Sequence, residues 1–395
     1  MIIMKILFLI LIIISIFFRI LYVWDFSIVL LVISCAIPVF LFTGIIYLKH
    51  TLKMNFSVSE KTAEKGQPFT VTLNVENKSI FPVSKAEAVI EYQNTINGDI
   101  NTVELHFPIQ SRNCQKIDFQ LTSKFCGKVK IRSSYVIIYD PIRLFKAKTA
   151  KNIQTEITIM PVCQEINGYI SDSCYTDEES NQFSQTKSGD DPSEVFDFHE
   201  YRTGDKPSRI HWKLSSKKDD FIVKELSMPV NEKIIIFPDI RCSENSEYTL
   251  PVFDTIMETL ISVSAFLLEN ERPHYIINYD SKSGTFNDVY IDDMKTLYSF
   301  IFSAVNNADI KYSKNPVSEF FSNYSELYCS SFICISHEAD TETIVNINQN
   351  VFSEIKNLLY ICKNQNENDF PDCEGINIMS ISAGKISQST AGIEL

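Results

Sequence analysis

The first fifty residues are apolar with few interruptions. Residues 6–24 form a run whose only charge is Arg19, and residues 26–48 form an uncharged run, with Asp25 between the two. About 20 apolar residues are enough for a helix to cross a bilayer. The pattern therefore predicts, within residues 1–50, a hairpin of two transmembrane helices at about 6–24 and 26–48. A cleaved signal peptide is the alternative for the first run, but no small-residue cleavage site follows it.

Residues 54–160 change to a short period. Residues 69–75 alternate between polar and apolar positions, and turn-forming residues at 76–79 and 97–99 separate further short runs. These runs lie at residues 86–92, 102–107, 116–121, 129–138 and 153–159. Short strands at regular spacing without a helical period are typical of an all-β sandwich. We therefore predict an immunoglobulin-like sandwich over residues 54–160.

The period changes again after residue 230. In residues 233–237, Lys233 is followed by four apolar residues in a row, as in a strand buried on both faces, and residues 251–269 carry apolar side chains at helical spacing. Further strands are expected at 274–279, 332–336, 358–362 and 376–381, and further helices at 294–305 and 317–327. Alternation of strand and helix predicts an α/β domain over residues 230–395, with a mainly parallel sheet and helices on both faces.

Charge is segregated in the stretch between these two domains. Residues 161–188 are polar and acidic, which predicts a linker or loop. Residues 172–200 hold nine acidic residues against one lysine, whereas residues 202–224 hold seven Lys and Arg against three Asp. Residues 203–207, Thr-Gly-Asp-Lys-Pro, have the composition of a turn. An acidic segment is therefore followed at once by a basic one.

The basic segment is predicted to form a rigid turn and a strand. Ile210 and Trp212 alternate with His211 and Lys213, which is a period of two. On this pattern Trp212 is the packing anchor, and its truncation to alanine is expected to cost a few kcal/mol. Lys213 points to the opposite side and stays exposed. Residues 221–223 read as a second short strand.

Residues 189–226 also carry a resemblance to a known family. The residues concerned are Tyr201, Arg202, Gly204 and Asp205, then Arg209, Ile210, His211, Trp212 and Lys213, then Ser216 and residues 223–225. In this order they resemble the signature of the bacterial family named domain of unknown function 58. The resemblance implies a sandwich before the signature, where Gly127 and Asp140-Pro141-x-x-Leu144-Phe145 fit the pattern. It also implies a von Willebrand factor A-like C-terminal domain.

That C-terminal domain would carry a degenerate metal site. A von Willebrand A domain that binds metal has Asp-x-Ser-x-Ser after its first strand, where oxygen ligands hold Mg²⁺. The matching residues here are Asp239, Arg241 and Ser243, so a guanidinium replaces the middle hydroxyl. His337 stands where a later acid is expected. We predict no metal and no cofactor; Arg241 pairs with Asp239 and fills the site, or the segment is a plain loop.

Other candidate chemistry is weak. His199, His211, Asp197, Asp205 and Ser208 lie close together in the sequence, but a catalytic triad is defined by geometry. The chain has no Gly-x-Ser-x-Gly motif. A net charge of −13 argues against nucleic acid as a partner.

The charges beside the apolar runs predict the topology. Lys5 precedes the first run, and Lys49, His50 and Lys53 follow the second, which places both ends in the cytoplasm by the positive-inside rule. The ten cysteines contain no Cys-x-x-Cys pair, which agrees with a reducing compartment.

These observations predict a multi-pass protein of the cell membrane whose soluble domains face the cytoplasm. Interaction or assembly is the expected function, and the signature residues are expected to serve docking or structure. The family resemblance implies a MoxR-type AAA+ ATPase and a transglutaminase-like membrane protein as partners. A metal-dependent or hydrolytic enzyme at the membrane is the alternative, although we predict no enzymatic activity. An extracellular adhesion module would require the opposite topology.

Overall fold

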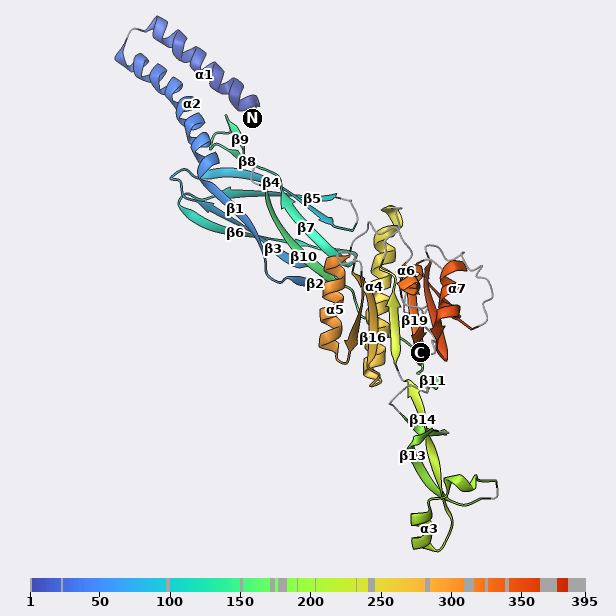
Figure 1. Cartoon of the computed structure of the whole chain (residues 1–395). Coiled ribbons are helices and arrows are strands. Elements are labelled where there is room, and N and C mark those ends of the chain that lie inside the picture. The colour runs from blue at the N-terminus through green and yellow to red at the C-terminus, as the bar shows by residue number, and fades with distance from the viewer. Residues whose placement is uncertain are drawn as a thin grey trace. The chain divides into compact units, whose positions relative to one another are not determined.

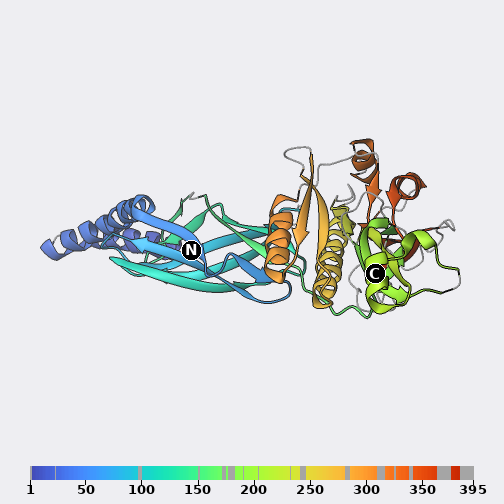
Figure 2. The same cartoon turned by 60° about the horizontal axis from the view of Figure 1, so that its bottom comes forward.

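The computed structural model divides the chain into two compact units, Met1–Met160 and Pro161–Leu395. Figures 1 and 2 show the chain from two directions. The structure describes residues 2–22, 24–96, 100–149, 152–170, 175–176, 183–189, 191–202, 204–231, 233–240, 246–280, 285–308, 316–323, 326–337, 341–362 and 375–382.

The first unit begins with a pair of helices, α1 (Ile2–Leu21) and α2 (Asp25–Thr51). Both have a mean hydropathy of 2.7, and only 6% and 17% of their most apolar windows are buried. A third described helix is apolar enough to span a membrane, at Thr249–Glu269, but 89% of its window is buried in the protein core. The predicted pair of apolar helices is confirmed, and it has the properties of a membrane anchor.

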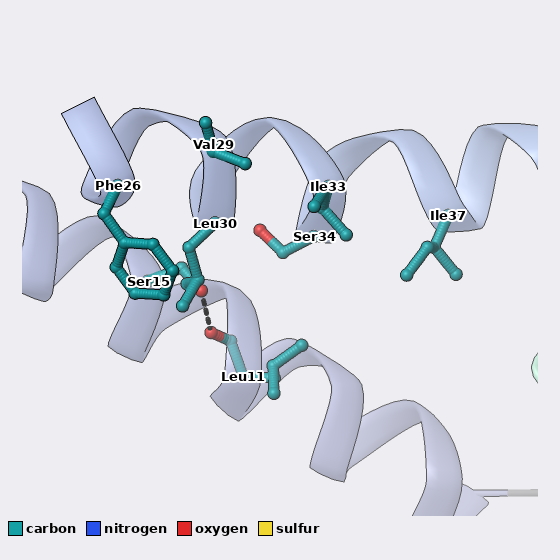
Figure 3. Close-up of a pocket in the computed structure, with 8 residues that line it drawn as sticks. All are labelled: Leu11, Ser15, Phe26, Val29, Leu30, Ile33, Ser34 and Ile37. Atoms are coloured by element: carbon teal, nitrogen blue, oxygen red, sulfur yellow. Dashed lines mark hydrogen bonds between the residues drawn. The ribbon is translucent and has the colours of Figure 1, made fainter.

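Serines lie where the two helices meet. Ser15, Ser27 and Ser34 are buried, and the hydroxyls of Ser15 and Ser34 donate to carbonyls of their own helices at 2.9 and 2.8 Å. Arg19 Nη1 donates to Ser27 Oγ across the connection at 3.2 Å. Small residues let apolar helices approach closely. A pocket of about 320 Å³ remains beside the serines, lined mainly by apolar side chains of α2 (Figure 3).

A β-sandwich follows the helices. One sheet has the order β1-β3-β6, and the other has the order β2-β10-β7-β4-β8-β9, with β5 paired to β4. The strands are β1 (Leu52–Val58), β2 (Thr62–Glu64), β3 (Phe69–Asn77), β4 (Val83–Asn94), β5 (Ile100–Ile109), β6 (Asn113–Leu121), β7 (Gly127–Ser133), β8 (Val136–Tyr139), β9 (Lys146–Thr149) and β10 (Ile153–Met160). Every second residue of β3 is buried, which is the alternation that the sequence shows.

The sandwich core continues into the second helix. α2 ends at Thr51 and β1 begins at Leu52, so the chain passes from helix to strand without a loop. Ile45 and Leu48 of α2 are buried in the same cluster as Leu52 and the sandwich core. The sheet and the last turns of the helix therefore pack as one body.

The second unit contains a six-stranded sheet of order β17-β16-β15-β19-β21-β22. Its strands are β15 (Ile234–Pro238), β16 (His274–Asp280), β17 (Thr285–Ile291), β19 (Ser331–Ser336), β21 (Ile355–Cys362) and β22 (Asn377–Ser382). All neighbours are parallel except β16 and β17. The predicted mainly parallel sheet is confirmed. β17, a short strand that returns on β16, has no counterpart among the predicted elements.

Helices pack on this sheet. α4 (Ser246–Glu269) contacts β15, β19 and β21, and α5 (Met294–Asn307) contacts β17. α6 (Pro316–Asn323) and α7 (Thr341–Asn350) contact each other and enclose a second apolar cluster with Phe237 and Phe332. The helix predicted at 317–327 is shorter than expected, because Leu327–Tyr328 forms strand β18, which pairs with β20 (Val351–Phe352).

The apolar cysteines of this domain lie in its core. Cys329, Cys334 and Cys362 are buried, as their apolar surroundings in the sequence predict. Burial raises the pKa of the Cys329 thiol to about 12. A thiol of this kind is inert, because the reactive form is the thiolate.

A β-arm precedes the α/β sheet in the chain. It consists of β11 (Tyr175–Thr176), β12 (Phe183–Gly189), β13 (Asp191–Glu200) and β14 (Ile222–Asn231), with the 3-10 turn η1 (Pro207–Arg209) and helix α3 (Trp212–Lys218) between the last two strands. β14 pairs antiparallel with β11, β12 and β13. β12 lies inside the stretch predicted as an acidic linker, so part of that stretch is paired in a sheet.

Candidate functional site

The signature residues occupy the connection between β13 and β14 at the end of the β-arm (Figure 1). This connection folds back onto the start of β14. Tyr201 N donates to Phe221 O at 2.7 Å, and His211 N donates to Ile222 O at 2.8 Å. Ile210 forms an isolated antiparallel bridge with Val223. The backbone of the signature is therefore held along its length by one strand.

A tight turn stands at the beginning of the connection. Asp205 Oδ2 accepts a 2.7 Å hydrogen bond from Arg202 N, and Asp205 N donates to Arg202 O at 3.0 Å. Gly204 has a φ of 120°, a conformation that favours glycine. The backbone hydrogen bond from Arg202 is the main cause that lowers the pKa of Asp205. Arg202 and Asp205 do lie together as predicted, but the contact that the structure records is to the amide of Arg202.

His199 lies between two carboxylates. Its Nε2 is 3.1 Å from Asp205 Oδ2, and its Nδ1 is 3.1 Å from Glu225 Oε1, in a geometry that does not make a hydrogen bond. The ring therefore connects the turn to β14. Of the residues that lie close together in the sequence, the structure thus brings His199 and Asp205 into contact, with both ring nitrogens of His199 directed at carboxylates.

The strand predicted at residues 210–213 is wrong. Pro207 starts the 3-10 turn η1, and α3 begins at Trp212. His211 caps this helix, because its Nδ1 accepts a 3.0 Å hydrogen bond from Leu214 N. A cap of this kind satisfies an amide that the first turn of a helix leaves free. The local capping interaction overrides a period of two that extends over only four residues.

Trp212 is not a packing anchor. Its side chain is 65% exposed, so the expectation that its truncation costs a few kcal/mol is withdrawn. The anchor of α3 is Ser215, which is buried and accepts a 2.9 Å hydrogen bond from Ile222 N. Ser215 Oγ also donates to His211 O at 3.1 Å. One small hydroxyl thus joins the helix to its own cap and to β14.

Three exposed aromatic rings meet on this connection. Phe221 lies edge-on to Trp212 at 6.1 Å and to Tyr201 at 6.4 Å between ring centroids. Their exposed fractions are 42% for Tyr201, 65% for Trp212 and 57% for Phe221. We call these three residues the aromatic surface. Exposed basic residues of the same connection are Arg202, Lys206, Lys213, Lys217 and Lys218.

A second polar cluster lies at the carboxyl ends of the parallel strands β15 and β19. Asp239 is fully buried, and its Oδ2 accepts a 3.0 Å hydrogen bond from Ser336 Oγ. His337 Nδ1 is 3.8 Å from the same oxygen. Such an edge is where ligands bind in open α/β sheets. Arg241 and Ser243 lie outside the described residues, so the predicted pairing of Arg241 with Asp239 stays a prediction.

No group of three or more His, Cys, Asp or Glu side chains that could hold a metal ion occurs within the described ranges. The cluster of Asp239, Ser336 and His337 offers one carboxylate, one hydroxyl and one imidazole. Magnesium prefers several oxygen ligands in octahedral geometry. The described part of this edge is therefore a hydrogen-bonded core cluster with few ligands for a hard cation.

Sequence reasoning missed three residues that build the arm site. Phe221 was assigned to a strand but forms the centre of the aromatic surface, Glu225 holds His199, and Ser215 holds α3. A signal for the first was present, since Phe221 follows the exposed pair Asp219-Asp220 and precedes the buried Ile222 and Val223. In a strand that alternates, such a position faces solvent.

Comparisons with known proteins add little. No protein-family model and no curated protein matches the chain. Among solved structures, a β-glucosidase from Erythrobacter marinus matches with 10% identity over 28% of this chain and 15% of its own, at a TM-score of 0.22. The CARDB domain of a Pyrococcus furiosus protein, in complex with two metal ions, matches with 9% identity over 28% of this chain and 87% of its own, at 0.21. A cohesin module from a Clostridium perfringens glycoside hydrolase matches with 14% identity over 27% and 96%, at 0.20. These likenesses are too weak to support an argument, and this chain spans only a small part of the β-glucosidase.

Proposed function

We propose that the chain is a membrane-anchored interaction or assembly protein, and that the aromatic surface of its β-arm captures a protein partner. The observation that carries the proposal is the exposure of Trp212, Phe221 and Tyr201 together. Large exposed apolar patches are unusual on soluble surfaces and mark contact sites. Trp, Tyr and Arg dominate the binding energy of many protein interfaces.

The construction of the arm supports a docking role. The rings are presented on a connection whose backbone is tied to β14, and the turn is held by Asp205 and His199. A contact surface that is ordered before binding loses less entropy on binding. The lysines around the rings favour a partner with an acidic surface, and complementary charge increases the association rate.

The finer identity of the domains rests on the resemblance of residues 189–226 to the family named domain of unknown function 58. On that basis we propose that the sandwich is immunoglobulin-like and that the α/β domain is a von Willebrand A-like domain with a degenerate metal site. On the same basis we propose that the captured partner is a MoxR-type AAA+ ATPase and that a transglutaminase-like membrane protein belongs to the same assembly.

The proposed capture is tested with the full-length chain in lipid nanodiscs and a purified MoxR-type ATPase from the same organism. We expect Trp212→Ala to weaken binding by about tenfold or more, as for a hot-spot residue. We expect Lys213→Glu to weaken it in a salt-dependent manner. The matched control is Lys124→Glu, an exposed lysine of the sandwich. Binding by both arm variants with unchanged affinity would show that the contact lies elsewhere, and absence of binding by the native chain would remove the ATPase as the partner.

We further propose that the soluble domains face the cytoplasm, from the basic residues Lys49, His50 and Lys53 that follow the second helix. Cys114 is an exposed thiol suited to the test, whereas Cys126 is buried and would not report orientation. In intact cells a membrane-impermeant maleimide should not react with Cys114. After lysis the same reagent should label it. The variant Cys114→Ser identifies its share of the signal among the other cysteines. Labelling of Cys114 before lysis would reverse the orientation.

A further inference from the structure

The strand registers place three connections of the sandwich at the end where α2 enters it. β1 begins at Leu52, which pairs with Asn77 at the end of β3, and Asn77 pairs with Asn113 at the start of β6. In the other sheet Val83 pairs with Ile109, and Lys85 pairs with Tyr139. The connections 78–82, 110–112 and 140–145 therefore all lie at this end, which we call the helix-proximal end (Figure 1).

Two of these connections touch the apolar helix itself. Phe81 lies edge-on to Phe40 and Tyr47 of α2, at 5.5 and 6.4 Å between ring centroids. Phe145 lies edge-on to Phe42 at 5.4 Å. The sandwich is therefore in contact with α2 well before the uncharged run of that helix ends at Leu48.

The Phe145 contact is held in place by a buried acid. Asp140 is 2% exposed, and its carboxylate accepts hydrogen bonds from the backbone amides of Ile142, Leu144 and Phe145. This carboxylate shapes the turn from β8 to β9 and fixes where Phe145 leaves it. The effect of this turn is to hold the Phe145 ring against the apolar helix.

The depth of these contacts follows from helix geometry. Phe40 follows Asp25 by 15 residues, which is about 22 Å of helix. The hydrocarbon core of a bilayer is about 30 Å thick. If Asp25 lies at the far surface, Phe40 and its contact Phe81 lie below the near edge of the hydrocarbon, and any tilt of the helix moves them deeper. The sandwich cannot then stand clear of the membrane.

The exposed side chains of the helix-proximal end match that position. Ile80, beside Phe81, is 58% exposed. Exposed basic residues of the same end are Lys49, Lys53, Lys78, Arg112, Arg143 and Lys146. Arg112 is adjacent to Ile80, because Arg112 N donates to Ser79 O at 3.0 Å. The acids of this end in the described part of the chain are the buried Asp140 and Glu76, which pairs with Lys78 at 3.3 Å.

The opposite end of the sandwich differs. Gly66 N donates to Ser123 O there, so the connections 59–68 and 122–126 meet. It lies about 30 Å away along the nine residues of β3. Of its lysines, Lys61 and Lys65 directly follow Glu60 and Glu64, and Lys124 lies in the second connection. The excess of cations is thus a property of the helix-proximal end, whereas an exposed isoleucine is present at both ends, since Ile100 at the start of β5 is 49% exposed.

We propose that the helix-proximal end of the sandwich is a membrane-binding surface, with Ile80 and Phe81 inserted at the hydrocarbon edge and Arg112 and Arg143 bound to the phosphates of anionic lipid headgroups. Apolar side chains at such an edge gain burial, and basic side chains near an anionic surface each add to the attraction. The sandwich is then fixed against the bilayer rather than attached only by its anchor. The inference depends on the apolar helix pair being in a membrane and does not depend on the proposed capture of a partner by the β-arm.

The apolar part is tested by fluorescence of the full-length chain in vesicles that contain brominated lipid. The two native tryptophans, Trp24 and Trp212, are changed to Phe, and Ile80→Trp is introduced. Gln67→Trp, an exposed position at the opposite end, is the matched control. We expect a blue-shifted emission and quenching at least about twofold stronger for Ile80→Trp, because bromine quenches only at contact with the lipid region. Equal quenching at the two positions would overturn the proposal.

The headgroup part is tested in the same background. Arg112→Glu together with Arg143→Glu should reduce the quenching of the Ile80→Trp variant in vesicles rich in phosphatidylglycerol, whereas Lys61→Glu with Lys124→Glu should not. Raising the salt from about 0.05 to about 0.5 M should reproduce the loss without any substitution, since screening shortens the Debye length. This second measurement does not depend on whether the double variant folds. If neither the two arginine substitutions nor the added salt changes the quenching, anionic lipid is not the ligand of this surface.

Discussion

Two clusters of aromatic rings in this chain have nearly the same geometry and opposite surroundings. In the α/β domain, Phe237 lies 5.4 Å from Phe320 and 6.5 Å from Phe332 between ring centroids, and each of the three is at most 4% exposed. In the β-arm, Phe221 lies 6.1 Å from Trp212, and both are more than half exposed. Ring contact alone therefore does not identify a core.

The difference between the clusters lies in what covers them. Phe237 comes from a strand between two parallel neighbours and under helices, so its burial stabilises the fold. The arm rings are held by backbone hydrogen bonds and by Ser215, which leaves their faces free of tertiary packing. The exposed cluster of the arm is therefore expected to contribute less to stability than the buried cluster of the α/β domain.

Truncation of the two clusters should separate stability from binding. We expect Phe237→Ala to lower the free energy of unfolding of the α/β domain by about 3–5 kcal/mol, the usual cost for a buried phenylalanine. We expect Trp212→Ala to lower stability by less than about 1 kcal/mol, because a largely exposed ring loses little burial. Hydrogen exchange of amides in β15 and in β14, measured in detergent, reports each region separately. A loss of protection in β14 of the Trp212→Ala variant as large as that in β15 of Phe237→Ala would contradict the comparison.

The sequence pattern predicts the core cluster and not the exposed one, for a physical reason. A continuous apolar run such as 234–237 has one stable environment, and strict alternation over nine residues of β3 leaves little choice of face. Residues 210–213 offer only two apolar positions. There the outcome depends on one capping nitrogen, His211 Nδ1, and on a proline that starts a turn. The secondary structure of so short a segment is determined by individual contacts, which the spacing of apolar residues does not predict.

Acid should distinguish the core from the arm in a second way. His274 is fully buried, its Nδ1 faces Arg272 O, and its Nε2 faces Ser264 Oγ. Burial lowers the pKa of His274 from 6.5 to about 4. The unfolded chain therefore takes up a proton first as the pH falls, so this stability is complete above pH 6.5 and is lost between 6.5 and 4. The loss amounts to about 3 kcal/mol.

Thermal melts of the full-length chain between pH 7.5 and 4.5 measure this loss. The variant His274→Gln should melt at a lower temperature at neutral pH and should show a smaller further decrease on acidification. His199→Gln is the control, because His199 sits among carboxylates near the surface of the arm. If both variants keep the acid-dependence of the native chain, the titration of His274 does not limit the fold.

The arm has an acid-sensitive group of its own, with a smaller expected effect. The pKa of Asp205 is lowered, chiefly by the hydrogen bond from Arg202 N. The turn is therefore stabilised above the ordinary aspartate pKa of 3.8, and this stabilisation is lost as the pH falls through the lowered value. Asp205→Asn should speed hydrogen exchange of the Arg202 amide at neutral pH and leave the exchange of β15 unchanged. Unaltered exchange at Arg202 would mean that the turn does not depend on the carboxylate.

The charged residues of the site show which of its features the sequence predicts and which it does not. The basic character of residues 202–224 is visible in the sequence, and Lys213 is exposed as predicted. The link from His199 to Glu225 is not visible in the sequence, because it joins two strands, β13 and β14, that become neighbours only when the chain folds back on itself. Asp239 lies at the end of a strand, as the sequence predicts, but its hydrogen-bond partner Ser336 comes from a strand almost a hundred residues later.

The smallest predicted effect concerns the lysines of α3, and it tests whether they act on the fold or on a partner. Lys213 lies in the first turn of α3 and Lys218 in the last. The dipole of a helix favours acids at its start and cations at its end, by a few tenths of a kcal/mol in exposed positions. Lys213→Glu should therefore leave α3 unchanged or slightly more stable, and Lys218→Glu should make it slightly less stable, as measured by hydrogen exchange of residues 215–218. If Lys213 lies beside the contact made by Trp212, the order is reversed for binding. Lys213→Glu should then lower the affinity for the partner more than Lys218→Glu does. Greater destabilisation of α3 by Lys213→Glu than by Lys218→Glu would show instead that Lys213 supports the fold, and the division between a structural core and a free arm surface would then fail at this exposed lysine.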